Sequence, residues 1–199
     1  MEEPRGRYSR GYLPHIEAGP VRQFITWRLA DAIRVDLLHQ WKQELSRLPE
    51  AESKKEFYRR IEAHLDEGFG SKLLQNPVAA SAVQNALIFG HGERYTLSAW
   101  CIMPTHVHCL LKPNEGWTMA KIMHSIKSFS AHEINKSLGR TGHLWQDESY
   151  DRIIRNDEHA HRIASYIEWN PVKAKLCADP KDWPYSSANP HAKEKLVQK

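Results

Sequence analysis

The feature that most constrains the fold is a pair of strand-like segments separated by a two-residue turn. Residues 95–103 and 106–112 are rich in apolar, β-branched and aromatic side chains, and Pro104 and Thr105 lie between them. Two such segments joined by turn residues predict an antiparallel β-hairpin. Strands and helices alternate around this hairpin without the regular rhythm of a parallel, doubly wound sheet, which points to an α+β fold.

Apolar residues recur at helical spacing in most of the remaining chain. Helices are expected over residues 30–48, 54–65, 77–89 and 118–138, and from Asn156 or Asp157 to Trp169 or Asn170. Pro171 is expected to end the last helix, because proline disfavours helical geometry in the residue before it. Further short strands are expected over residues 23–29, 144–146 and 150–155. The sum is an antiparallel sheet with helices packed on it.

The length of 199 residues suits one domain with a sizeable core. Residues 1–20 carry Arg5, Arg7 and Arg10 among glycines and prolines, and they are expected to form a basic arm without regular structure. The folded domain is placed at residues 21–187. Residues 188–199 are expected to be a mobile basic tail.

Composition limits the environment and the partners. No run approaches 18 apolar residues, and the charged start lacks the apolar core of a secretory signal. We therefore expect a cytoplasmic location without membrane association. The three cysteines form no C-x-x-C pair, which argues against a disulfide framework or a zinc ribbon. The net charge of +4, the seven Trp and the seven Tyr permit nucleic-acid binding, although many housekeeping enzymes share these values.

His106 and His108 begin the second strand of the expected hairpin. Side chains two residues apart in a strand leave the same face, about 6.6 Å apart along the chain, so these imidazoles could hold one divalent metal ion. Two strand histidines satisfied by backbone groups are the competing interpretation. The other such pair, His159 and His161, lies in a helical segment where the side chains point about 200° apart, and it cannot chelate.

Tyr166 and Asn170 lie one turn apart on one edge of the last expected helix. If this edge faces the imidazoles, two nitrogen ligands and an amide oxygen could bind a metal beside a tyrosine hydroxyl. Mg²⁺ or Mn²⁺ suits such mixed ligation, and zinc also fits. A tyrosine is a poor nucleophile near its usual pKa of about 10, so it would attack a phosphodiester that the metal polarises and form a phosphotyrosine link.

Each of these residues has a structural alternative. Tyr166 could be an ordinary tyrosine at the edge of the core, and Asn170 could simply end the helix before Pro171. Tyr150 is a rival nucleophile. It ranks below Tyr166 because its strand-like segment offers no carboxamide one turn away.

Four short motifs together resemble a known family. They are Met-Pro-Thr-His-Val-His at 103–108, Gly-x-Leu-Trp-Gln at 142–146, Tyr-Asp-Arg-x-Ile-Arg at 150–155 and Tyr-Ile-x-x-Asn-Pro-Val-Lys at 166–173. Their order resembles the REP-associated tyrosine transposases, which are single-tyrosine HUH transposases of the IS200-like superfamily. The resemblance extends from about Gly11 to Ser187, and the combination is far more specific than any one motif.

The resemblance implies a ferredoxin-like domain that cuts and rejoins single-stranded DNA beside hairpin repeats through a 5′-phosphotyrosine. It implies His106 and His108 as the metal pair, Tyr166 as the nucleophile and Asn170 as the third ligand of Mg²⁺ or Mn²⁺. The family commonly has Asn where this chain has Thr105, which is expected to act as a turn former. Helices inserted between the first strand and the hairpin are a second departure, so a monomeric or homodimeric state does not carry over.

Five basic residues are expected to contact DNA phosphates, although solvated surface explains the lysines nearly as well. They are Lys121, Lys127, Arg152, Arg155 and Arg162. Trp145 and Trp169 could stack on unpaired bases, with core packing favoured for Trp145. Two other functions stay open at this point: a relative that binds hairpin DNA or RNA without cutting it, and a metal-binding hydrolase in which Tyr166 is structural.

Overall fold

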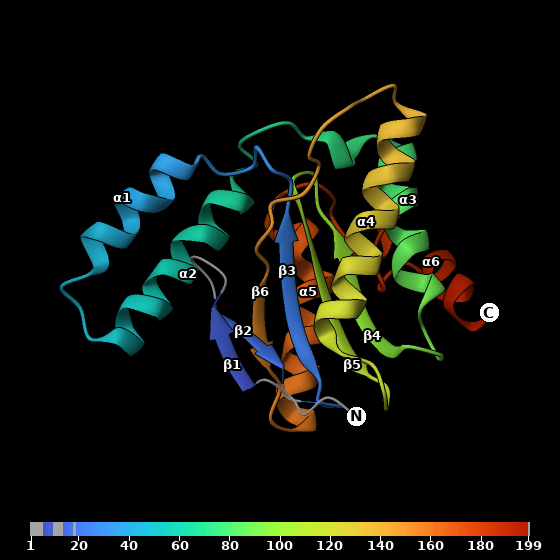
Figure 1. Cartoon of the computed structure of the whole chain (residues 1–199). Helices are drawn as coiled ribbons and strands as arrows, with labels where there is room; N and C mark the ends of the chain where they lie inside the picture. Colours follow the sequence, from blue (N-terminus) through green and yellow to red (C-terminus); the bar gives the residue numbers. More distant parts are fainter. Residues whose placement is uncertain (1–5, 10–13, 18, 199) are drawn as a thin grey trace.

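The computed structural model describes residues 6–9, 14–17 and 19–198 (Figure 1). Its strands are β1 (Gly6–Ser9), β2 (Pro14–Glu17), β3 (Gln23–Arg28), β4 (Tyr95–Ile102), β5 (His106–Pro113) and β6 (Tyr150–Ile153). Its α-helices are α1 (Val35–Leu45), α2 (Glu50–Asp66), α3 (Pro77–Phe89), α4 (Met119–Ser137), α5 (Asp157–Lys173) and α6 (Pro190–Val197). Two short 3₁₀ turns, η1 (Leu73–Gln75) and η2 (Pro180–Asp182), complete the described elements.

The main sheet has four strands in the order β4-β5-β3-β6, and all neighbours are antiparallel. The chain passes from β3 to β4 through α1, α2 and α3, and β5 lies between these two strands in the sheet. It then passes from β5 to β6 through α4, and β3 lies between those two strands. Two such split β-α-β units make a ferredoxin-like fold. The predicted α+β class, the central hairpin and the helices inserted before it are therefore confirmed.

The two faces of the sheet are covered by different helices. Trp27 and Trp100 lie in the larger core, which includes residues of α3 and α4. Phe24 and Leu110 point to the opposite face, where they pack with residues of α5. Figure 1 shows α4 in front of the sheet and α5 behind it. Because side chains alternate along a strand, His106 and His108 share the α5 face with Leu110.

Polar side chains cap the starts of three helices that cover the sheet. Asn76 caps α3 by accepting from the Val78 backbone N–H, Thr118 caps α4 and Asn156 caps α5. Short polar side chains at these positions satisfy backbone N–H groups that a helix start leaves without partners. The structure thus selects Asn156 over Asp157 as the cap of the last helix.

The first expected helix begins later than the spacing of apolar residues indicates. Instead of Ala30, it begins at Val35. The backbone N–H of Leu29 donates to the Thr105 carbonyl, and that of Ala30 donates to the Leu144 carbonyl. These tertiary hydrogen bonds fix the backbone of Leu29 and Ala30 outside a helix, and residues 30–33 form a turn and a bend instead.

The last helix continues through Pro171 to Lys173, so the expectation that it ends by Asn170 is wrong. Proline removes one backbone donor from the helix. The hydrogen bonding resumes after it, because the Ala174 N–H donates to the Asn170 carbonyl. Asn170 and Pro171 are both buried, so packing compensates the lost hydrogen bond and extends α5 by three residues.

Both chain ends contain more structure than expected. Within the supposed arm, β1 and β2 pair as an antiparallel ribbon, and β2 lies against β6. Arg7 lies in β1, whereas Arg5 and Arg10 lie outside the described residues. The supposed tail contains α6, whose Ala192 is buried in the core. Asn189 starts that helix as its cap, a signal that the sequence interpretation overlooked.

The strand expected at residues 144–146 is reduced to a single bridge between Leu29 and Trp145. Residues 185–187 line the outer edge of β4, where the Ile102 N–H donates to the Tyr185 carbonyl. Within the described part of the chain, no helix is both long and apolar enough to cross a membrane.

Candidate active site

His106 and His108 form the centre of the candidate site. Both are buried on the α5 face of β5, and their Nε2 atoms lie 3.0 Å apart. At this distance the two imidazole nitrogens can share one hydrogen bond. Alternatively, both can bind a common metal ion through their lone pairs. The expected close pair is present in the fold.

Threonine hydroxyls fix the orientation of both rings. The Thr26 Oγ1 lies 2.7 Å from the His108 Nδ1, and the Thr105 Oγ1 lies 3.0 Å from the His106 Nδ1. Hydrogen bonds at Nδ1 leave Nε2 for a metal, which is how ligating histidines are usually held. Thr105 therefore orients an imidazole as well as occupying the turn. Sequence reasoning missed Thr26, which is one of three polar residues in β3 and gives no stronger signal than the other two.

Burial keeps both imidazoles neutral. It lowers the pKa of His106 to about 3, with a further lowering from the nearby Arg28 guanidinium. Burial also lowers the pKa of His108 well below its usual value, and the charges of His106 and Lys173 act in the same direction. Neutral imidazole is the form that binds metals, so the pair is ready for a metal at neutral pH.

We expect the folded protein to lose stability as the pH falls below about 6.5. In that range the unfolded chain binds protons at these two histidines while the folded chain does not, so each group lowers the free energy of unfolding by up to about 1.4 kcal/mol per pH unit. For His106 the effect continues to a pH of about 3. Urea unfolding between pH 4.5 and 8 without metal measures it. A His106→Gln/His108→Gln variant should show a shallower slope, and an identical slope would contradict the assignment.

The histidine pair fits a metal with a cis arrangement of ligands. Two nitrogens at about 2.1 Å from one ion lie about 3.0 Å apart when they subtend a right angle and about 3.4 Å apart at the tetrahedral angle. The observed Nε2–Nε2 distance is 3.0 Å. Within residues 6–9, 14–17 and 19–198, no group of three His, Cys, Asp or Glu side chains could hold a metal. A third protein ligand from the described residues would therefore be of another type.

Asn170 meets the requirements for that third donor. It is fully buried, and neither atom of its side-chain amide has a hydrogen-bond partner of good geometry. A buried amide without partners costs free energy, and a bound ion or water would supply the missing partner. Its helix α5 packs against β4 and against β5, the strand that carries the two histidines. The amide oxygen is thus a candidate donor on the helix that faces the imidazoles.

Tyr166, one turn before Asn170 on α5, lies against His108 of the histidine pair. Its ring centroid is 5.8 Å from that of His108 and 6.0 Å from that of Phe24, in edge-on arrangements. Phe24 in turn stacks on His108. The rival Tyr150 contacts Phe24 and the Tyr58 ring on α2 instead. Tyr166 is therefore the tyrosine that the fold brings to the imidazoles.

The phenol of Tyr166 stays protonated at neutral pH. Burial raises its pKa, Glu62 raises it further, and Asn170 acts in the opposite direction. Such a hydroxyl attacks only an electrophile that is already activated, and its proton must leave as the new bond forms. The arrangement of a neutral imidazole pair, a buried amide and a protonated phenol is therefore suited to metal-assisted nucleophilic chemistry.

Three further charged residues near Tyr166 were not identified as site residues from the sequence. Glu62 and Asp66 lie one turn apart on α2, and Lys173 lies at the end of α5. The Lys173 Nζ is 3.5 Å from the Asp66 Oδ2 and 5.5 Å from the centre of the Tyr166 ring. Only the docking of α2 against α5 brings these groups to the site, so spacing along the chain gave no signal.

Three of the five predicted phosphate contacts gather near one end of α5. Arg152, Arg155 and Arg162 all lower the pKa of His159, after the larger effect of burial. All three arginines are exposed, and Arg162 pairs with Glu158 on the same helix. Arg162 also lies one turn before Tyr166. A cationic surface therefore leads along α5 to the candidate nucleophile.

Lys127 departs from the expectation of an exposed phosphate contact. It is half-buried, and its Nζ donates to the carbonyl oxygens of Gln146 and Asp147. Burial lowers its pKa to about 8, although Asp147 acts against this lowering. Lys127 thus ties α4 to the loop before β6. Lys121 is exposed on α4, which covers the face of the sheet opposite to α5.

Replacing these lysines separates the two roles. We expect Lys127→Ala to lower the free energy of unfolding by about 1–3 kcal/mol, because two carbonyls lose their donor. We expect Lys121→Ala to leave stability within about 0.5 kcal/mol. Denaturant unfolding of both variants measures the difference. Equal stability of the two variants would contradict the structural role of Lys127.

The two tryptophans differ as expected in their surroundings. Trp145 is buried, and its indole N–H donates to the Ser130 hydroxyl. Trp169 is 56% exposed on α5. Core packing therefore explains Trp145, and only Trp169 presents a surface on which a base could stack.

The part of the chain that holds these residues is similar to known proteins. The family model described as "Transposase IS200 like" matches residues 72–170, which include both histidines, Tyr166 and Asn170. A REP-associated tyrosine transposase of Escherichia coli strain K12 is 29% identical over 98 residues, which are 47% of this chain and 54% of that protein. A Haemophilus influenzae protein, provisionally named a REP-associated tyrosine transposase, is 29% identical over 108 residues, 49% of this chain and 61% of its own.

The fold agrees with a solved structure as well. The structure described as a REP-associated tyrosine transposase bound to a REP hairpin superposes with a TM-score of 0.54 and 20% identity, covering 94% of this chain and 82% of that one. At this identity the likeness shows the shared fold. The matched region spans only about half to three fifths of the curated relatives. Residues 72–170 are thus an IS200-like transposase domain, and the chain is similar in sequence to the REP-associated tyrosine transposases.

Proposed function

We propose that this protein is a metal-dependent strand transferase that cleaves and rejoins single-stranded DNA beside hairpin repeats through a 5′-phosphotyrosine. The observation that carries the proposal is the contact of Tyr166 with the buried His108, whose Nε2 lies 3.0 Å from that of His106. Neither a binding module nor a structural tyrosine needs a nucleophile placed against two oriented, neutral imidazoles. The buried, unpartnered amide of Asn170 adds a third donor at the same place.

His106, His108 and Asn170 would hold the metal, for which Mg²⁺ and Mn²⁺ are the candidates. When bound, such an ion supplies Lewis acidity that stabilises the charge developing on a phosphodiester. Thr26 and Thr105 keep the imidazoles oriented for this task. The neutral state of both rings follows from their burial and needs no proton release before they bind the ion.

Tyr166 would supply the nucleophile. Its oxygen forms a bond to the phosphorus and loses its proton, the bond from phosphorus to the 3′ oxygen breaks, and that oxygen takes up a proton. The products are a 5′-phosphate joined to Tyr166 and a free 3′ hydroxyl, and the reverse reaction rejoins the strand. In-line geometry requires the hydroxyl to be held in place, which the contacts with His108 and Phe24 favour.

Hairpin DNA is the proposed partner. The solved relative of the same fold was captured with a REP hairpin. The cationic surface of Arg152, Arg155 and Arg162 could contact phosphates, and the exposed Trp169 offers a ring for stacking. Phosphate contacts release counterions, so we expect hairpin affinity to fall by about 40-fold between 50 and 200 mM salt if three phosphates are contacted.

The test is a search for the covalent product. The full chain is incubated with Mn²⁺ or Mg²⁺ and a hairpin oligonucleotide that carries a single-stranded flank and a label on the 3′ side of the expected cut. A labelled protein band that survives a denaturing gel and disappears after protease treatment is the expected result. Binding of the hairpin without any adduct, over a panel of flanks, would favour a non-cleaving binder instead.

A further inference from the structure

We propose that Glu62 is a positioning residue for the nucleophile, accepting the hydrogen of the Tyr166 hydroxyl and thereby fixing the direction of its lone pairs. The proposal rests on the proposed function and deepens it. Glu62 lies on α2, which ends before residue 72, where the match to the family begins. A helix outside the matched domain thus contributes to the arrangement of the tyrosine.

Helix α2 is firmly placed. Phe57, Ile61 and Leu65 form its buried side and belong to the main core. Tyr58 packs against Tyr150 of β6 in a tilted arrangement, with ring centroids 4.2 Å apart. Side chains with these contacts leave the helix little freedom to rotate. The neighbouring side of α2, which carries Glu62, is therefore held at a fixed orientation.

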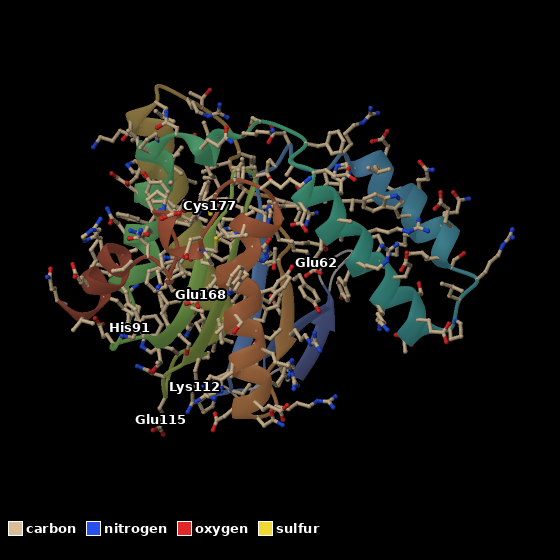
Figure 2. All side chains as sticks on the ribbon, turned by 180° about the vertical axis from the view of Figure 1, so that it is seen from behind. Glu62, His91, Lys112, Glu115, Glu168 and Cys177 are labelled. Atoms are coloured by element: carbon tan, nitrogen blue, oxygen red, sulfur yellow. The ribbon has the colours of Figure 1, made fainter. Side chains whose placement is uncertain are left out.

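This orientation directs Glu62 toward Tyr166. Burial raises the pKa of the Tyr166 phenol most, and the nearby carboxyl of Glu62 raises it further. Figure 2 shows Glu62 between α2 and α5. One turn further along α2, Asp66 pairs with Lys173 across the same gap, at 3.5 Å. The side of α2 that carries Glu62 and Asp66 therefore faces the helix that carries the nucleophile.

An acceptor on the α2 side would fix the direction of the Tyr166 hydroxyl hydrogen. A phenol hydroxyl can point its hydrogen to either side of the ring, and only one choice leaves a lone pair facing an incoming phosphorus. A carboxylate that accepts the hydrogen on the α2 side turns the lone pairs away from α2. Fixing this choice before the reaction removes an entropic cost from the attack. A side chain that accepts a hydrogen bond is enough for this role.

The variants Glu62→Ala and Glu62→Gln test the proposal, with Glu52→Ala as the matched control. Glu52 is an exposed glutamate in the first turn of the same helix. The measurements are the single-turnover rate of adduct formation at saturating hairpin, the hairpin Kd and the circular dichroism spectrum. We expect Glu62→Ala to slow adduct formation by about 10- to 100-fold. Its Kd should stay within about threefold of the parent value, because Glu62 contacts no phosphate in this arrangement.

The conservative variant separates positioning from general support of the fold. Glu62→Gln retains an oxygen that can accept the hydroxyl hydrogen, so its rate should stay within about threefold of the parent chain. Equal rates for Glu62→Ala and Glu52→Ala would overturn the proposal, as would an equal loss in Glu62→Gln and Glu62→Ala. The parent chain in the same gel reports separately on the proposed function, whose failure would appear as no adduct in any lane.

Discussion

Replacing Tyr166 with Phe is expected to abolish the covalent protein–DNA adduct, a loss of at least about 1000-fold, while hairpin binding and stability remain close to those of the parent chain. The substitution removes the attacking oxygen and keeps the ring that packs against His108 and Phe24. A missing nucleophile cannot be replaced by the remaining transition-state interactions. Denaturing gels measure the adduct, and fluorescence anisotropy measures hairpin affinity.

Tyr150→Phe is the matched control for this prediction. Tyr150 is also half-buried and also touches Phe24, with ring centroids 6.1 Å apart. Its hydroxyl serves no step in the proposed reaction, so adduct formation should persist within about threefold. An adduct that survives in Tyr166→Phe and disappears in Tyr150→Phe would transfer the role of nucleophile to Tyr150.

The second large effect is expected from the metal pair. His108→Ala should lower the rate of adduct formation by more than about 100-fold at any Mn²⁺ concentration, because one of the two nitrogen donors is lost. Hairpin affinity should change little, since the buried His108 contributes no charge to the exposed arginines proposed to contact phosphates. Single-turnover rates over a series of Mn²⁺ concentrations measure the loss. A rate restored in full by excess metal would show weaker binding without an essential role in catalysis.

The hydroxyl that orients His108 gives a smaller, graded version of the same effect. Thr26→Val keeps the shape of the side chain and removes the oxygen 2.7 Å from the His108 Nδ1. A loss of about 10- to 100-fold in metal affinity or rate is expected for such an outer partner. Thr96→Val, at an exposed position of β4, is the control and should behave as the parent chain does.

The local periodicities identified most elements, because they depend on neighbours in the chain. The alternation of apolar residues and the Pro104–Thr105 turn predicted the β4–β5 hairpin, and the bounds expected for α3 agree with the structure. Failures occurred where tertiary contacts outweighed local preference. The backbone of Leu29 and Ala30 pairs with distant carbonyls, and the burial of Pro171 carries α5 past the residue expected to end it.

The sequence by itself determined the chemistry that is available: two histidines on one strand face, a tyrosine and an amide on one helix edge, and a family resemblance that the comparisons confirm. Only the tertiary structure decided how these groups meet. The strand register places Thr26 against His108, and the packing of α2 on α5 brings Glu62 to Tyr166. Side-chain spacing is a local property of helices and strands, whereas strand register and helix docking depend on the whole core. Contacts between residues far apart in the chain therefore could not be predicted from local patterns.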